Sequence, residues 1–272
     1  KEIFAQLENN NHISVKGGAG SAVSIFAAEL FLTHKKNVLY LVDDKEDALY
    51  ANAEMEDLLG KEKVLYFPAT HLDPYQVEKT QNANLVLRTE VLNKINSSKS
   101  PKVIVAYAGA LSEKVLKKED FKAISHHIKV GDQLDFDFVD ELLNHYNFQQ
   151  ADFVSEPGEF SVRGGIVDVF SYSNEKPYRI TFFGNEVESI KTFDIESQLS
   201  VDKVKDFQLV SNMNFSVTGS RVSLLQLLAE ESFIVSKNGI VGMQKIKAFY
   251  EKSLEKYETL NKDIAHRTPQ EL

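Results

Sequence analysis

A glycine-rich run at residues 17–24, GGAGSAVS, has the composition of a phosphate-binding loop. Such loops follow the pattern G-x-x-x-x-G-K-[ST], in which backbone N–H groups cradle phosphates, the lysine reaches the terminal phosphates and the hydroxyl holds magnesium. In this run Gly17 takes the first glycine position, Gly20 lies inside the loop and Ser24 takes the hydroxyl position. Val23 takes the lysine position and brings no charge to the phosphates. We therefore expect a tight strand-to-helix turn, which uses the backbone freedom of glycine, instead of a hydrolytic site.

A second position bears on the same chemistry. In phosphate-loop enzymes, an apolar strand ends in acidic residues that hold magnesium and water. Here the apolar strand expected at 233–236 is followed by Lys237 and Asn238. A lysine at the metal position repels the cation, because magnesium is bound by carboxylate, carbonyl and water oxygens. Two separate positions thus argue against ATP hydrolysis.

The third feature is the run EPGEFSVRGGIVDVF at 156–170, which continues as PYRITFFG at 177–184. Pro-Gly and Gly-Gly mark turns or bulges. Arg163 lies among glycines and acidic residues with Phe160 nearby, and arginine and aromatic residues are common at the centres of protein interfaces. The competing interpretation makes Arg163 a local ion-pair partner and assigns four aromatic side chains to the core: Phe160, Phe170, Phe182 and Phe183. Composition alone favours this second interpretation.

Other candidates for chemistry are weaker. His126 and His127 are adjacent in an expected strand, so they point to opposite faces and cannot chelate one metal together. The seven histidines have no metal-ligand spacing, and the chain has no cysteine, so disulfides and thiolate chemistry are excluded. Asp43 and Asp44 follow a strand, where α/β proteins often bind ligands, but we favour a helix-capping role for them.

The elements that carry these residues fall into two patterns. Up to residue 110, strands and helices alternate, which predicts a parallel sheet with helices on its faces. The expected strands are 12–15, 37–42, 63–67 and 102–107, and the expected helices are 21–34 (capped by Ser21), 45–59 and 82–95. Beyond residue 111 we expect a strand at 124–130, a helix at 137–146 and mainly strands over 148–210, with a hairpin turn at Gly184-Asn185.

Near residue 220 the helical pattern returns. We expect a helix at 220–228, a strand at 232–236 and a long helix from 241 to about 264. Its apolar stripe is Met243, Ile246, Tyr250, Leu254 and Tyr257. One strand and one long helix cannot easily make their own core, so this segment is expected to return to the first domain. The predicted organisation is an α/β domain formed by 1–110 and 211–272, with an α+β domain at 111–210 inserted in it.

Length and charge agree with this division. At ~150 residues per domain, 272 residues predict about two domains. The net charge is −9, and residues 111–210 account for −8 of it, with 19 acidic and 11 basic side chains. This segment is unsuited to neutralising nucleic-acid phosphates, and a protein is the better partner. No apolar run reaches the ~20 residues that span a bilayer, so we expect no membrane partner. We also expect a cytoplasmic location. The N-terminus has neither a signal-peptide pattern nor an initiator methionine, so we expect a fragment of a longer protein.

The runs at 156–170 and 177–194 together resemble the second domain of a family that includes the excision-repair protein UvrB and the transcription-repair coupling factors (Mfd). The shared elements are Pro-Gly-Glu-Phe, Val-Arg-Gly-Gly, Asp-x-Phe and Phe-Phe-Gly. The resemblance extends to LYFPATHLDPYQ and NLVLRTEVL in the N-terminal region and to LLQLLAEESFIVSKN near the C-terminus. It implies a degenerate RecA-like, P-loop-like parallel-sheet domain that has lost its motor motifs, with an inserted α+β domain that binds UvrA.

The resemblance also implies site residues. Arg163 matches the arginine that contacts UvrA in this family, and Phe170 and Arg179 match positions on the same β domain. Phe148, Gln150 and Phe160 complete the expected UvrA-binding set. This chain departs from the family in two ways: Gln149-Gln150 stand where a basic residue is usual, and Ser161 stands where UvrB has a second arginine. Glutamine can still form hydrogen bonds but carries no charge.

We therefore expect a non-catalytic, monomeric module without a cofactor or metal, which recruits UvrA where RNA polymerase has stalled. The full-length protein is expected to be an ATP-dependent DNA translocase that also binds RNA polymerase and double-stranded DNA. Two alternatives stay open. The chain is an atypical P-loop NTPase or DNA-remodelling domain, or it is an autoinhibitory clamp that packs on the rest of its own protein and masks the UvrA-binding face.

Overall fold

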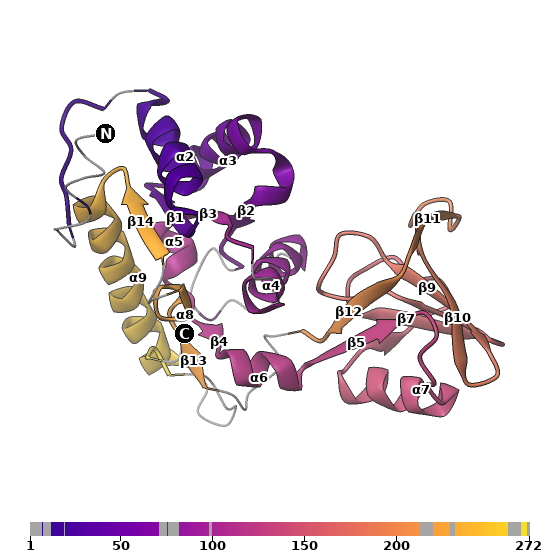
Figure 1. The fold of residues 1–272 in the computed structure, drawn as a ribbon. Helices are drawn as coiled ribbons and strands as arrows, with labels where there is room; N and C mark the ends of the chain where they lie inside the picture. Colours follow the sequence, from indigo (N-terminus) through magenta and orange to yellow (C-terminus); the bar gives the residue numbers. More distant parts are fainter. Residues whose placement is uncertain are drawn as a thin grey trace.

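The computed structural model of the chain describes residues 7, 12–18, 20–70, 75, 82–97, 100–212, 220–228, 232–260 and 268–270. The ribbon forms two lobes (Figure 1). Strands β5 (Ser125–Lys129) and β12 (Asp206–Val210) pair antiparallel where the chain enters and leaves the second lobe. The first lobe is built on a parallel sheet and the second on a mostly antiparallel one, which confirms the predicted fold class.

The sheet of the first lobe has four parallel strands in the order β14-β1-β3-β2. They are β1 (Asn37–Val42), β2 (Val64–Phe67), β3 (Val103–Tyr107) and β14 (Ser232–Ser236). The first three are mostly buried aliphatic and aromatic runs, as expected of parallel strands that are covered on both faces. β14 joins the sheet beside β1 after the chain has passed through the second lobe, as an insertion requires.

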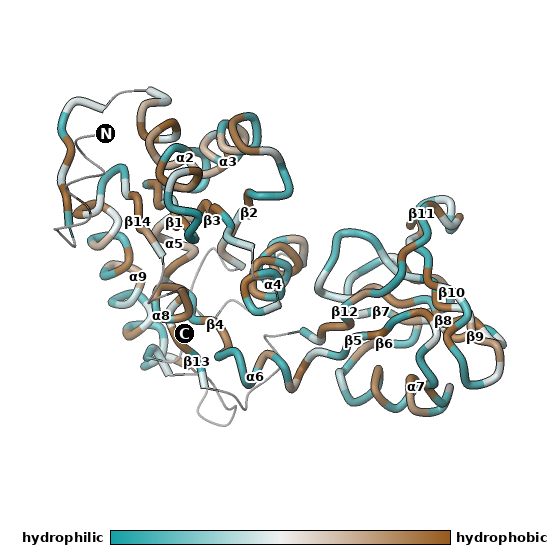
Figure 2. The backbone as a smooth tube through the Cα atoms, in the orientation of Figure 1, coloured by the Kyte–Doolittle hydropathy of each residue, from teal (hydrophilic) through white to brown (hydrophobic). Residues whose placement is uncertain are grey.

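Helices cover both faces of this sheet. Val38 and Tyr40 of β1 pack in one cluster with apolar residues of α2 (Ala22–His34) and α3 (Lys45–Leu59). Leu39 faces the other way and packs with α4 (Asn82–Ser97). Short helices α5 (Ala108–Leu111) and α8 (Leu224–Leu228) and the long α9 (Gly239–Thr259) complete that side. Figure 2 shows hydrophobic strands between helices that alternate hydrophobic and hydrophilic residues. In the part of the chain that the structure describes, no helix is long and apolar enough to cross a membrane.

The second lobe contains a six-stranded sheet in the order β11-β10-β9-β8-β7-β6, antiparallel except for the β6–β7 pair. Its strands are β6 (Gln149–Gln150), β7 (Glu159–Arg163), β8 (Ile166–Val169), β9 (Tyr178–Phe183), β10 (Glu186–Phe193) and β11 (Ser200–Val204). One face packs against the β5–β12 pair and α7 (Phe136–His145). The opposite face carries the small buried cluster of Val154, Phe170 and Phe193. The remaining short elements are η1 (Lys61–Lys63), β4 (Val115–Leu116), α6 (Lys118–Ala123) and β13 (Arg221–Val222).

Most expected elements are confirmed within a few residues, including the hairpin at Gly184-Asn185, where Gly184 has a φ of 59°. The expected strand at 12–15 is wrong, because residues 12–18 have no regular structure and Val15 is exposed. The helix expected at 220–228 begins at Leu224 and is preceded by β13. The long helix ends at Thr259, and residues 261–264 of the expected helix lie outside the described residues.

Two apolar side chains also differ from expectation. The interpretation that makes Arg163 a local ion-pair partner assigns Phe183 to the core. Phe183 is instead 79% exposed near the tip of the β9–β10 hairpin. Met243, on the expected stripe of α9, is 74% exposed, while Ile246 packs against the main core. The stripe of α9 is therefore only partly covered within the described residues.

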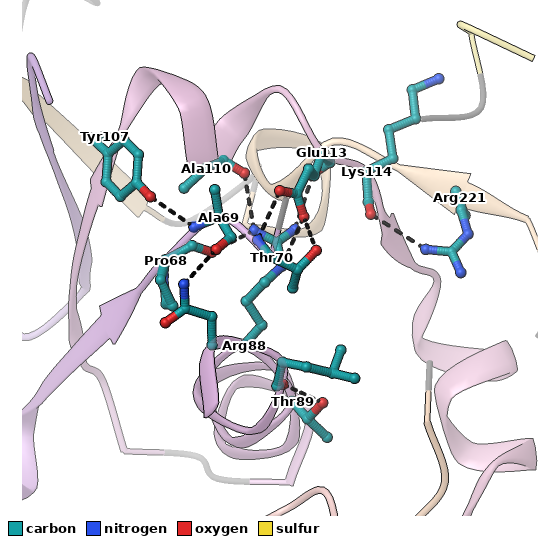
Figure 3. Close-up of polar contacts among 12 residues, drawn as sticks. Pro68, Ala69, Thr70, Arg88, Thr89, Tyr107, Ala110, Glu113, Lys114 and Arg221 are labelled. Atoms are coloured by element: carbon teal, nitrogen blue, oxygen red, sulfur yellow. Dashed lines mark hydrogen bonds and ion pairs between the residues drawn. The ribbon is translucent and has the colours of Figure 1, made fainter. Parts of the chain in front are cut away.

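A buried polar network lies at the carboxyl ends of β2 and β3 and joins the segments that follow them to α4 (Figure 3). The guanidinium of Arg88, on α4, donates to the carbonyl oxygens of Pro68 (2.8 Å), Ala110 (3.0 Å) and Glu113 (3.2 Å). The Glu113 carboxylate lies 3.7 Å from Arg88 and accepts from the backbone N–H and hydroxyl of Thr70 at 2.8 and 2.7 Å. One arginine thus joins three chain segments at an edge where α/β proteins commonly bind ligands.

Candidate partner-binding site

The glycine turn has the backbone of a tight loop. Gly17 and Gly20 have φ angles of 91° and 56°, in the left-handed region that glycine adopts without strain. Helix α2 begins at Ala22, directly after the turn. Val23, at the position of the phosphate-binding lysine, is partly buried and packs against the α2–α3 cluster. Its side chain therefore contributes to packing in the first lobe.

The hydroxyl groups of this turn are engaged by the protein itself. Ser21 and Ser24 donate to the two oxygens of the Glu54 carboxylate, from α3, at 2.6 and 2.5 Å. These hydrogen bonds hold the pKa of Glu54 below its ordinary value. Burial raises the pKa of Tyr40, whose hydroxyl lies 3.2 Å from that of Ser24. Ser21 is the N-cap residue of α2, as predicted, but its hydroxyl bonds to Glu54 instead of the helix backbone.

Internal contacts also engage the acidic groups after β1. Asp44 caps α3 by accepting from the N–H of Asp47 at 3.0 Å, which confirms the predicted capping role for Asp44. The Asp43 carboxylate instead accepts from the side-chain amide of Asn238 at 3.4 Å. Lys237 forms an ion pair with Asp47 at 3.2 Å, and this bond raises the lysine's pKa. Lys245 donates to the backbone oxygen of Asp43 at 2.7 Å. Among the described residues, no group of three or more histidine, cysteine or carboxylate side chains could hold a metal ion.

The second lobe presents a cluster of two arginines around one carboxylate. Arg179, on β9, donates to both oxygens of Asp168, on β8, at 2.7 and 2.8 Å. Arg163, on β7, donates to the same carboxylate at 3.1 Å. The carboxylate side chain is 1% exposed, while Arg179 is 21% and Arg163 is 47% exposed. Asp168 thus fixes the position of a guanidinium that is half in solvent.

Aromatic rings support the same two arginines. The Arg179 guanidinium lies 4.8 Å from the ring centre of Phe193, and that of Arg163 lies 5.3 Å from the ring centre of Phe153. Phe193 belongs to a small buried cluster with Val154 and Phe170, whereas Phe153 is 62% exposed. Arg179 also donates to the backbone oxygen of Gln198 at 3.1 Å, and its bonds to Asp168 raise its pKa. Arg163 keeps an open side toward solvent and toward an exposed ring.

A hollow of about 550 Å³ lies next to Arg163, between β7 and the loop that follows β6. It is lined by Gln150, Ala151, Asp152, Ser161, Val162 and Arg163. Its lining combines a guanidinium, amide and hydroxyl groups and the carboxylate of an exposed aspartate. Such a surface can form charge-assisted hydrogen bonds with acidic groups of a partner.

The six predicted binding residues fall into two groups. Gln150 and Arg163 line the hollow, and Arg179 supports Arg163 through Asp168. The aromatic members are all buried: Phe148, Phe160 and Phe170. Their side chains cannot touch a partner in this conformation, although they pack beneath the strands that carry the arginines. Sequence reasoning did not single out Phe153, and it included Asp168 only in the shared Asp-x-Phe element, without a role at the site. The strand register brings Asp168 beside both arginines.

Comparison with known proteins shows what this lobe and the rest of the chain are similar to. Residues 126–215 match the UvrB interaction domain. The chain is 28% identical over 76% of its length to the transcription-repair-coupling factor of Bacillus subtilis, and 31% identical over 66% to that of Rickettsia bellii. It is 24% identical over 93% of its length to UvrABC system protein B of Ureaplasma parvum, covering 42% of that protein. The chain spans 18% and 16% of the two coupling factors. The predicted resemblance is confirmed.

Proposed function

We propose that this chain, which carries a UvrB interaction domain and is similar to transcription-repair-coupling factors over about three quarters of its length, is a non-catalytic module that binds UvrA. It recruits UvrA to sites where RNA polymerase has stalled, by presenting a surface like that of UvrB. The proposal rests on the position of the Arg163 side chain. This side chain is half exposed beside a hollow and held in place by the buried carboxylate of Asp168.

The second lobe is the UvrA-binding domain, corresponding to 111–210, and the first lobe is its scaffold, corresponding to 1–110 and 211–272. RNA polymerase binding and ATP-driven DNA translocation belong to other parts of the full-length protein. The chain is a monomer that works in the cytoplasm. This division assigns Phe148, Phe160 and Phe170 a supporting role and leaves direct contact to Gln150 and Arg163.

Three features of the first lobe support a non-catalytic role. Val23 supplies no charge at the phosphate-binding position, and Ser24 donates to Glu54. Lys237 forms an ion pair with Asp47 where a catalytic acid would be needed. Magnesium-dependent ATP hydrolysis by the pure chain, lost on substitution of Ser24, would support the alternative of an atypical NTPase.

The proposal is tested by isothermal calorimetry of the chain with purified UvrA. Arg163→Ala is expected to weaken binding by ~1–2 kcal/mol, or about 5- to 30-fold, because a preorganised guanidinium at an interface is lost. Lys129→Ala is the matched control, since this exposed cation lies on β5 of the same lobe, away from the hollow. No binding by the folded wild-type chain would refute the function, and equal affinities of Arg163→Ala and the control would refute the site.

A further inference from the structure

A row of polar residues crosses the face of the six-stranded sheet that lies opposite α7, one residue per strand, and two of its members, Ser161 and Asp168, are buried. The register pairs Ser161 with Asp168, Asp168 with Arg179, Arg179 with Lys191, and Lys191 with Lys203. The row therefore runs from β7 to β11. Directly paired residues point to the same face of a sheet, so these five side chains share the face that carries Arg163.

The charges along this row are unbalanced. Asp168 is shared by Arg163 and Arg179, which leaves one net positive charge in that cluster. Lys191 and Lys203 lie directly opposite each other, and neither forms an ion pair within the described ranges of the chain. Like charges placed opposite each other in a sheet are destabilising. This basic stripe, defined as Arg163, Arg179, Lys191 and Lys203, lies in a segment with a net charge of −8.

Apolar side chains lie on the same face as the stripe. Ile166 pairs with both Arg163 and Thr181, and it is partly exposed. Phe183 lies two positions beyond Thr181 on the same strand and is 79% exposed. Phe153 lies beside Arg163. Cations interleaved with exposed aromatic and aliphatic side chains are typical of protein interfaces, whereas a phosphate backbone needs the cations alone.

We infer that the UvrA-binding face extends from Arg163 across the sheet to Lys191 and Lys203, and that it takes an acidic segment of UvrA with apolar side chains between its carboxylates. This inference rests on the proposed function. Strands lie ~4.8 Å apart, so the stripe from β7 to β11 is roughly 19 Å long, which about six residues of extended chain would cover. Carboxylates of this segment form ion pairs with Lys191 and Lys203.

The test is a charge-reversed double variant, Lys191→Glu with Lys203→Glu, titrated with UvrA at low and at physiological salt. We expect about tenfold weaker binding at low salt and a shallower dependence of affinity on salt, because two complementary charges are reversed. The matched control is Lys122→Glu with Lys129→Glu, which makes the same change in net charge on α6 and β5. The control is expected to bind within about twofold of wild type.

A single Lys203→Glu variant separates binding from folding. It places opposite charges across β10 and β11, so its unfolding midpoint should stay equal to wild type or rise while UvrA binding weakens. If wild type binds UvrA and Arg163→Ala weakens it, but the double variant matches its control, the inference is overturned and the proposed function stands. If the wild-type chain does not bind UvrA, both the proposed function and this inference are refuted.

Duplex DNA is the second probe in the same series. If the wild-type chain binds a labelled duplex and the double variant loses that binding while keeping its affinity for UvrA, the stripe is a nucleic-acid contact and the inference is overturned. If the double variant loses UvrA binding and neither protein binds the duplex, the acidic protein segment is supported as the occupant.

Discussion

Replacing Arg88 with methionine tests whether the buried network holds the first lobe together. Methionine has a similar length and keeps contact with the ring of Phe67, whose centre lies 4.0 Å from the guanidinium. It removes every polar bond that Arg88 makes. Three backbone carbonyls, of Pro68, Ala110 and Glu113, lose a charged donor, and the carboxylate of Glu113 loses its cation.

The expected cost follows from these losses. Each buried acceptor left without a partner costs about 1–3 kcal/mol, and breaking a buried ion pair from one side costs about 3–5 kcal/mol. These contributions overlap because they share one guanidinium, and Glu113 keeps its two bonds from Thr70. We therefore expect Arg88→Met to lower the free energy of unfolding by about 3–5 kcal/mol, a large part of a typical 5–15 kcal/mol. The melting temperature should fall by about 6–20 °C.

Urea denaturation followed by circular dichroism measures the loss, provided that the slope of free energy against urea is unchanged. Lys94→Met is the control, because it removes a cation from the same helix where the ion pair with Glu90 is partly exposed, and it should cost less than ~1 kcal/mol. If Arg88→Met costs no more than Lys94→Met, the network does not stabilise the fold as argued.

Two further predictions concern carboxylates. Asp168→Asn should lower the free energy of unfolding, measured by urea denaturation, by about 2–4 kcal/mol. This is less than the loss of a fully buried ion pair would cost, because Arg163 and Arg179 are partly exposed. The variant should also bind UvrA more weakly, and unchanged binding would show that Arg163 does not need Asp168 to hold its position. The pKa of Glu54 is lowered in the folded protein, so its stabilisation is present above the ordinary glutamate value of about 4.3 and is lost as pH falls through the folded value. Glu54→Gln should therefore lower the free energy of unfolding by less than ~1 kcal/mol at neutral pH. The urea midpoints of the variant and the wild type should converge in acid, and a difference between them that does not change with pH would contradict this.

The sequence was sufficient where burial alone decides the structure. The aliphatic runs at 37–42 and 102–107 predicted the central strands, because a strand covered on both faces has few alternatives. It failed at 12–15, where an apolar pattern has no sheet to join and stays exposed. Local pattern says which residues favour a strand, and the neighbouring strands decide whether one forms.

The site was predictable only in part, for a related reason. Arg163 could be singled out from its neighbours along the chain, but its anchor could not. Asp168 reaches Arg179 through the register of β8 with β9, and Lys191 reaches Lys203 through that of β10 with β11. Cross-strand pairs are long-range information that a single sequence does not display.

The pairing of β5 with β12 has a consequence for how the chain folds. Tyr107 ends β3 and Ser232 begins β14, so the parallel sheet is completed only after a long connection has been closed. Once the second lobe has formed, Ser125 and Val210 are neighbours, and the stretch between them no longer counts toward that closure. The remaining connection is about a third as long, which lowers the entropic cost of closure by about 1 kcal/mol. Because its two ends lie side by side, the folded second lobe acts as a short connection between β3 and β14. Early folding of the second lobe should therefore speed the folding of the first lobe.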